Sequence, residues 1–71
     1  MTRYQIRALT DLFEDYQITR ADSADYWTLY EIGANDEAQA LGDYSSLEDA
    51  LARTERGSRV EILTLETYEG A

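Results

Sequence analysis

The segment from Asp25 to Gly33, DYWTLYEIG, alternates between two sets of side chains with a period of two. No other stretch constrains the fold as strongly. The even positions from Tyr26 to Ile32 would share one face of the chain, and Trp27, Leu29 and Glu31 would share the other. This alternation is typical of a β-strand in a sheet with two different faces. We expect the large Trp27 side chain to belong to the core.

Turn residues follow this strand and indicate a hairpin. The sequence GANDEA, residues 33–38, contains Gly, Asn and Asp, and AQALGDY, residues 38–44, returns as a second strand. Upstream, YQITRA, residues 16–21, is a further short strand candidate. Together these segments predict a three-stranded meander from Tyr16 to Tyr44.

The sequence SSLEDALARTERG contains the clearest helix signals. Ser45 or Ser46 can serve as the N-cap, acids occupy the first turn, and arginines occupy the last. Gly57 can adopt the left-handed conformation after the helix. These signals predict a helix over about 46–56.

Residues 58–69, SRVEILTLETYE, indicate another strand. Val60 and Ile62 alternate with Glu61, and Leu63 and Leu65 then take the opposite face. Because this strand would be apolar in part on both faces, we expect it at the centre of the sheet rather than at an edge.

The first fifteen residues allow two interpretations. Apolar residues including Phe13 cluster on one side of a helical wheel, but a single helix would begin with arginines and end with acids, against its own dipole. We therefore favour a strand over residues 3–9 followed by a helical turn over residues 10–15. The predicted fold is one small α+β domain, residues 1–71, with an antiparallel sheet of four to five strands and one main helix on one face.

Acidic residues are concentrated in the middle of the chain. Fifteen Asp and Glu against six Arg and no Lys give a net charge of −9 at pH 7. Residues 1–20 are balanced, whereas residues 21–52 contain eight acids and no base. Such runs are usually solvated faces that keep a small protein soluble, but carboxylates without local cations also repel one another. The charge disfavours nucleic acid and anionic membranes as partners and favours a basic protein.

The side chains that catalysis needs are scarce. The chain has no Cys, His or Lys, so a Ser or Thr nucleophile lacks its usual activating groups and transition metals lose their preferred ligands. Paired carboxylates could hydrolyse a glycoside only in a cleft that a domain of this size rarely encloses. The glycines do not form a phosphate-binding loop, and no calcium-binding motif occurs. We expect no enzyme activity, no cofactor and no metal.

The sequence instead predicts a partner-binding surface on the sheet face that the helix leaves open. Tyr26, Tyr30 and Ile32 would lie there among carboxylates, and tyrosines and carboxylates both suit an interface with an arginine-rich partner. The predicted partner-binding residues are Asp22, Asp25, Tyr26, Tyr30, Glu31, Asp36, Glu37, Asp43, Tyr44, Glu48 and Asp49.

With its cation-free segment from Ala21 to Ala52, its small size and its lack of catalytic groups, the chain resembles the small acidic phage-encoded inhibitors of bacterial defence. These are anti-CRISPR proteins and other DNA mimics. The resemblance covers composition and size along the whole chain. It implies an inhibitor that occupies a basic nucleic-acid-binding surface of a partner, such as a CRISPR–Cas complex, in the host cytoplasm.

Two alternatives stay open. The protein could be a small housekeeping or structural domain whose acidity reflects solubility or adaptation to high salt, or an antitoxin-like neutraliser of a basic protein. The N-terminal sequence MTRYQIRALT lacks the apolar run of a signal peptide, and no segment approaches the roughly 20 apolar residues of a membrane span. We therefore expect a cytoplasmic location.

Overall fold

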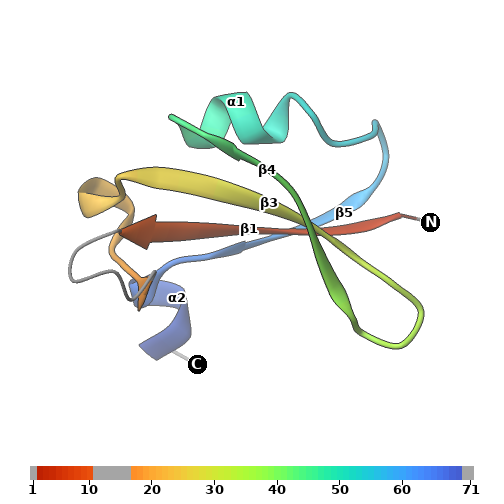
Figure 1. The fold of residues 1–71 in the computed structure, drawn as a ribbon, viewed down its shortest axis with the longest axis horizontal. Coiled ribbons are helices and arrows are strands. Elements are labelled where there is room, and N and C mark those ends of the chain that lie inside the picture. Colours follow the sequence, from red (N-terminus) through yellow and green to blue (C-terminus); the bar gives the residue numbers. More distant parts are fainter. Residues whose placement is uncertain (1, 11–16, 70–71) are drawn as a thin grey trace.

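The computed structural model describes residues 2–10 and 17–69. The helical turn expected over residues 10–15, together with Phe13, lies almost wholly outside these residues. The chain forms an α+β fold in which a twisted sheet carries one short helix over a face and a second at its end (Figure 1). The elements, in chain order, are β1 (Arg3–Thr10), β2 (Gln17–Ile18), the 3-10 helix η2 (Ala21–Ser23), β3 (Tyr26–Ile32), β4 (Ala38–Tyr44), α1 (Leu47–Leu51), β5 (Arg59–Leu63) and α2 (Leu65–Glu69).

Strand β1, whose prediction as a strand is confirmed, lies at the centre of the sheet. It pairs antiparallel with β3 from Arg3↔Ile32 to Leu9↔Tyr26, and β3 pairs antiparallel with β4. On its other side β1 pairs with β5 along one half and with β2 at its C-terminal end. The predicted meander is therefore wrong, because β2 joins β1 rather than β3.

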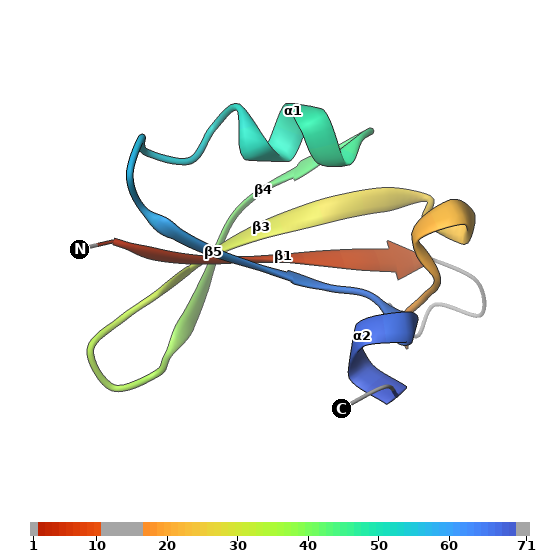
Figure 2. The ribbon, with the colours of Figure 1, turned by 180° about the vertical axis from the view of Figure 1, so that it is seen from behind.

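The sheet is mixed, not antiparallel as predicted, because β5 runs parallel to β1. Strand β4 also runs in this direction, since β3 is antiparallel to both β1 and β4. The chain leaves β4, passes through α1 over the sheet and returns as β5 beside β1 (Figure 2). A crossover of this kind brings the next strand back in the same direction.

Strand β5 corrects two further expectations. Among the described residues it pairs with β1 only, so it is not the central strand. It also ends at Leu63, because Thr64 and Thr67 start a helix there: the Thr64 amide donates to Thr67 Oγ1 at 2.8 Å, and the Thr67 amide donates to Thr64 Oγ1 at 3.3 Å. This reciprocal pairing has the geometry of a capping box and begins α2.

The β3–β4 hairpin is confirmed with the predicted second strand. The Gly33 amide donates to the Glu37 carbonyl at 2.8 Å, and the Asp36 amide donates to the Gly33 carbonyl at 3.0 Å. Asp36 has a φ of 61°, in the left-handed region. This is the three-residue loop in which a tight turn is followed by a left-handed residue.

Helix α1 begins as predicted but is shorter than the expected 46–56. Ser46 is its N-cap, and its Oγ accepts a hydrogen bond from the Asp49 amide at 3.1 Å. After Leu51 the backbone leaves the α-helical pattern, because the Arg53 and Thr54 amides donate to carbonyls three residues earlier, those of Ala50 and Leu51, both at 3.1 Å. The Thr54 hydroxyl also donates to the Leu51 carbonyl at 2.8 Å. Gly57 does take a positive φ of 80°, in the turn that leads to β5.

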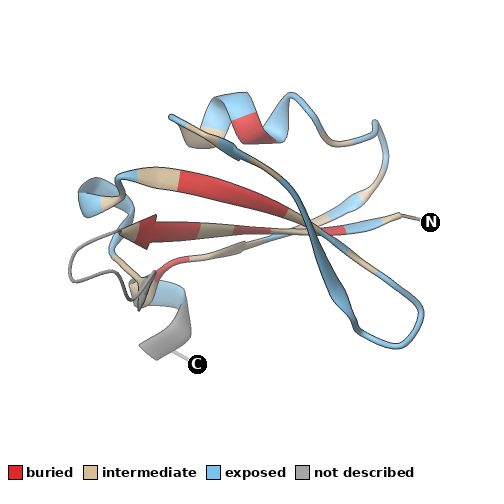
Figure 3. Ribbon diagram, viewed as in Figure 1, coloured by how far each residue is buried: buried red, intermediate tan, exposed pale blue. Residues whose placement is uncertain are grey.

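The core lies between α1 and the sheet. It consists of alternate residues of β1 and β3 beneath one buried residue of α1, and these appear as the buried stretches in Figure 3. Its members are Tyr4, Ile6, Ala8, Trp27, Leu29 and Ala50. The core position expected for Trp27 is confirmed. The other residues of the same strands face the opposite side of the sheet, which is open except around Leu9 and Thr28, both of which are buried.

Candidate protein-binding surface

All eight acids of the cation-free segment are exposed, including every carboxylate predicted to bind a partner. Six of them belong to the β3–β4 hairpin and to α1, and no basic residue occurs between Tyr26 and Leu51. Strands β1 and β5 instead carry Arg3, Arg7 and Arg59. The charge imbalance along the sequence thus becomes a separation across the sheet, with acids toward the β4 edge.

The first group of these acids lies at the hairpin tip. Glu31 and Glu37 line a shallow hollow of about 340 Å³ together with Gln39 of β4. Asp36, although adjacent in sequence, turns away and accepts a hydrogen bond from Arg3 at 3.1 Å, the one ion pair found among the described residues. Its charge is therefore partly compensated, whereas Glu31 and Glu37 have no cationic partner in the described part of the chain.

The second group lies where β4 meets α1. Asp43 and Asp49 line a hollow of about 420 Å³ with Tyr44 and with Arg53, which follows α1. Thr28 Oγ1 donates to Asp43 at 2.7 Å, and Ser45 Oγ donates to Asp49 at 3.4 Å. These neutral donors orient both carboxylates without cancelling their charge.

We refer to five of these residues as the acidic edge because they lie in β4 or in the segments next to it, namely β3, the hairpin turn and α1. Its members are Glu31, Glu37, Asp43, Glu48 and Asp49. Asp43 lies six positions after Glu37, a span of about 20 Å at the rise of an extended strand. The acidic edge is therefore long and narrow.

The two remaining predicted acids lie before β3 rather than along β4. Asp22 belongs to η2. Asp25 accepts a hydrogen bond from Thr10 Oγ1 of β1 at 2.8 Å, and its amide donates to the Leu9 carbonyl. Asp25 is thus tied to the end of β1.

The predicted tyrosines differ in their surroundings. Tyr30 does lie on the open face, but its ring is covered by Arg7, whose guanidinium carbon is 4.2 Å from the ring centroid. Tyr44 is half-buried and packs against the core, and Tyr26 is half-buried at the start of β3. Tyr30 and Tyr44 thus have structural roles that the prediction did not include.

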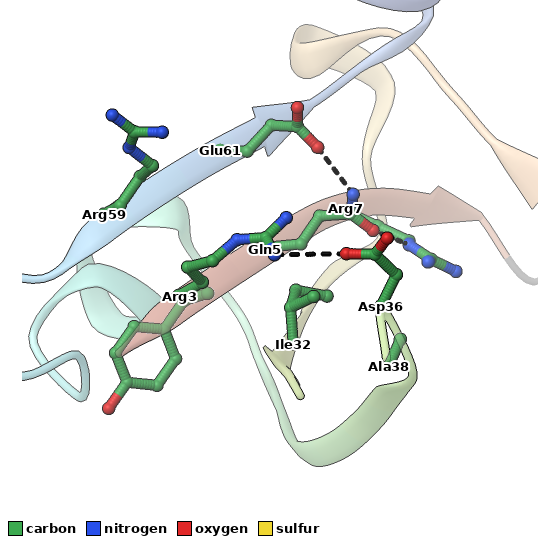
Figure 4. Close-up of a pocket in the computed structure, with 9 residues that line it drawn as sticks. Arg3, Gln5, Arg7, Ile32, Asp36, Ala38, Arg59 and Glu61 are labelled. Carbon is green, nitrogen blue, oxygen red and sulfur yellow. Dashed lines mark hydrogen bonds and ion pairs between the residues drawn. The ribbon is translucent and has the colours of Figure 1, made fainter. Parts of the chain in front are cut away.

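The open face also holds three arginines that the sequence-based prediction missed. Figure 4 shows Arg3, Arg7 and Arg59 around a hollow of about 450 Å³. Two hydrogen bonds connect its polar side chains: Arg7 Nε donates to Gln5 Oε1 and Gln5 Nε2 donates to Glu61 Oε1, both at 2.6 Å. The alternation of Arg, Gln and Arg at positions 3, 5 and 7 was the signal that could have placed them there.

No family model, curated protein or solved structure matches this chain. Interpretation of the surface therefore depends on its chemistry. Within residues 2–10 and 17–69, no group of three or more potential ligands could hold a metal ion, and no helix is both long and apolar enough to cross a membrane. The same residues leave no buried side-chain polar atom without a hydrogen-bond partner.

Proposed function

We propose that this protein is a non-enzymatic binding protein whose acidic edge occupies a basic, nucleic-acid-binding surface of a partner protein. The observation that carries the proposal is the separation of charge across the sheet. The five carboxylates of the acidic edge are exposed and have no ion-pair partner among the described residues. Arg3, Arg7 and Arg59 lie on other strands, and Arg53 lines the hollow of Asp43 and Asp49 without an ion pair to either. A basic partner would supply the missing cations.

The dimensions of the acidic edge support competition with nucleic acid. Its length of about 20 Å along β4 is comparable to about six nucleotides of one DNA strand, since phosphates follow one another at about 3.4 Å along the helix axis. An arginine- or lysine-lined groove that binds phosphates could bind these carboxylates instead. By this proposal the protein is a DNA mimic, and an inhibitor of a CRISPR–Cas complex is one form that it would take.

The experiment that tests this proposal is a pull-down from host lysate with the wild-type protein and two charge-reversed variants. The test variant combines Asp43→Lys with Asp49→Lys on the acidic edge. The control combines Glu55→Lys with Glu61→Lys, which changes the net charge equally but lies on β5 and the turn before it. Circular dichroism would verify that both variants fold.

We expect the wild-type and control proteins to capture a nucleic-acid-binding protein that is released by high salt or by short duplex DNA. The Asp43→Lys, Asp49→Lys variant should capture little or none of it. Equal capture by all three proteins, or a captured partner that DNA does not displace, would contradict the proposed function.

A further inference from the structure

Strand β4 is an open edge of the sheet. It pairs with β3 on one side only, and no described residue pairs with its other side. Five of its seven residues are exposed, as the pale strand in Figure 3 shows. An edge strand presents unpaired backbone amides and carbonyls that can accept a further strand.

The hairpin register identifies which backbone groups face outward. In an antiparallel ladder, pairs that exchange hydrogen bonds alternate with pairs that do not. Because the Gly33 amide bonds to the Glu37 carbonyl, the next pair, Ile32↔Ala38, is of the non-bonded kind, and so is Tyr30↔Ala40. The backbone groups of Ala38 and Ala40 therefore point away from β3.

These outward positions are unobstructed by their own side chains. Ala38 and Ala40 carry only a methyl group, and both are exposed. The register shift between Leu29 and Tyr30 leaves Leu41 as an extra residue of β4, and this leucine is 46% exposed. No bulky side chain at Ala38 or Ala40 therefore blocks the outward backbone groups of the free edge. The exposed Leu41 side chain follows, and an added strand could cover it.

The charges around this edge indicate what would occupy it. We propose that β4 binds an extended basic segment of the partner by β-strand addition, an inference that rests on the proposed function and specifies its docking mode. Acids border both ends of the edge, with Glu37 before Ala38 and Asp43 after Leu41. Arginines or lysines flanking the hydrogen-bonded residues of the added strand would meet these carboxylates.

A second copy of this chain is a poorer occupant because its edge carries the same charges. In the antiparallel arrangement centred on Ala40, Glu37 of each copy would lie opposite Asp43 of the other. Like charges directly opposite one another destabilise a strand pair, whereas a basic strand converts the same positions into favourable pairs.

The test uses hydrogen exchange of the isotope-labelled protein, measured by NMR, with a synthetic heptapeptide of alternating arginine and valine. With the peptide at about 100 times its Kd, exchange at the amides of Ala38 and Ala40 should slow by about 100-fold. The Gln39 amide, which faces β3, should be slow with or without peptide. A glutamate–valine peptide is the charge control and should leave exchange unchanged.

A pair of proline variants separates strand addition from simple charge attraction. Ala40→Pro removes an outward amide without removing a bond to β3, so the fold should persist while peptide binding is lost. Ala34→Pro is the matched control, because Ala34 occupies the turn position where proline is favoured. It should bind as the wild type does.

The possible outcomes distinguish this proposal from the proposed function. Binding of the basic peptide without protection of Ala38 and Ala40 would overturn strand addition and leave charge-driven docking intact. Absence of peptide binding would also overturn it, whereas the proposed function fails only in the pull-down with the charge-reversed variants. Protection that rises with protein concentration in the absence of peptide would assign the edge to a second copy and overturn the basic occupant.

Discussion

The guanidinium of Arg7 covers the ring of Tyr30 across the β1–β3 pair, 4.2 Å from the ring centroid. Thr28, not Tyr30, is the direct register partner of Arg7, so the contact is diagonal. The stacked arginine also donates from Nε to Gln5, which gives it two partners on the open face. A tyrosine predicted from the sequence to contact a partner is thus engaged within the chain.

This contact should contribute measurably to stability. We expect Arg7→Gln and Tyr30→Leu each to lower the free energy of unfolding, and the double variant to show a coupling energy of about 0.5–1 kcal/mol, the range for a cation–π pair at an exposed site. Urea denaturation of the four proteins measures the coupling. Purely additive effects would show that the stacking contributes nothing.

Two leucines of the hairpin should differ sharply in their contribution to stability. Leu29 is 1% exposed in the core, so Leu29→Ala should lower the free energy of unfolding by about 2–5 kcal/mol. Leu41 is 46% exposed, and Leu41→Ala should change the free energy of unfolding by no more than about 0.5 kcal/mol. Chemical denaturation compares the two variants directly. Similar losses from both would mean that β4 packs more tightly than its exposure indicates.

Asp36 combines an unfavourable backbone conformation with a surface ion pair. Its φ of 61° suits glycine or asparagine, and its side chain, whose carboxylate meets Arg3, is 81% exposed. A surface ion pair contributes little, whereas the left-handed conformation costs most residues with a Cβ about 1–2 kcal/mol, aspartate less than others, and costs glycine nothing. We therefore expect Asp36→Gly to match or exceed wild-type stability.

Asp36→Ala is the control, because it loses the ion pair and keeps the conformational cost. It should melt at a lower temperature than Asp36→Gly in a thermal unfolding experiment. The reverse order of melting temperatures would indicate that the pairing with Arg3 outweighs the backbone conformation.

The cap of α1 provides another comparison of neighbouring residues. Ser46 Oγ accepts a hydrogen bond from the Asp49 amide. Ser46→Ala should lower the free energy of unfolding by about 1 kcal/mol. Ser45 is exposed and makes only a long contact of 3.4 Å to the Asp49 carboxylate, so Ser45→Ala should have little effect. Thermal unfolding of both variants tests the assignment. A larger loss of stability in Ser45→Ala than in Ser46→Ala would indicate that Ser45, not Ser46, is the N-cap of α1.

Local signals predicted several elements because neighbouring residues determine them. The alternation from Tyr26 to Ile32 identified β3, and the Gly, Asn and Asp of the turn identified its hairpin with β4. The serine before Leu47 identified the start of α1. Each signal depends on the backbone preferences of a few consecutive residues, which the sequence displays directly.

The errors have different physical causes. The strand expected through residue 69 ends early because Thr64 and Thr67 pair their side chains and amides. Helix α1 ends early because the Arg53 and Thr54 amides donate to carbonyls three residues earlier rather than four. Both ends depend on local hydrogen bonds that a periodicity of apolar residues does not reveal.

The sequence by itself determined that the side chains from Tyr26 to Ile32 alternate as in a β-strand, that a capped helix starts near Leu47, and that the segment from Ala21 to Ala52 is acidic and lacks cations. Only the tertiary structure decided that β5 runs parallel to β1, that three arginines share the open face, and that β4 is an edge bordered by acids. Those properties depend on which strands become neighbours, and residues far apart in the chain establish such neighbours only when the core closes around Ile6 and Leu29.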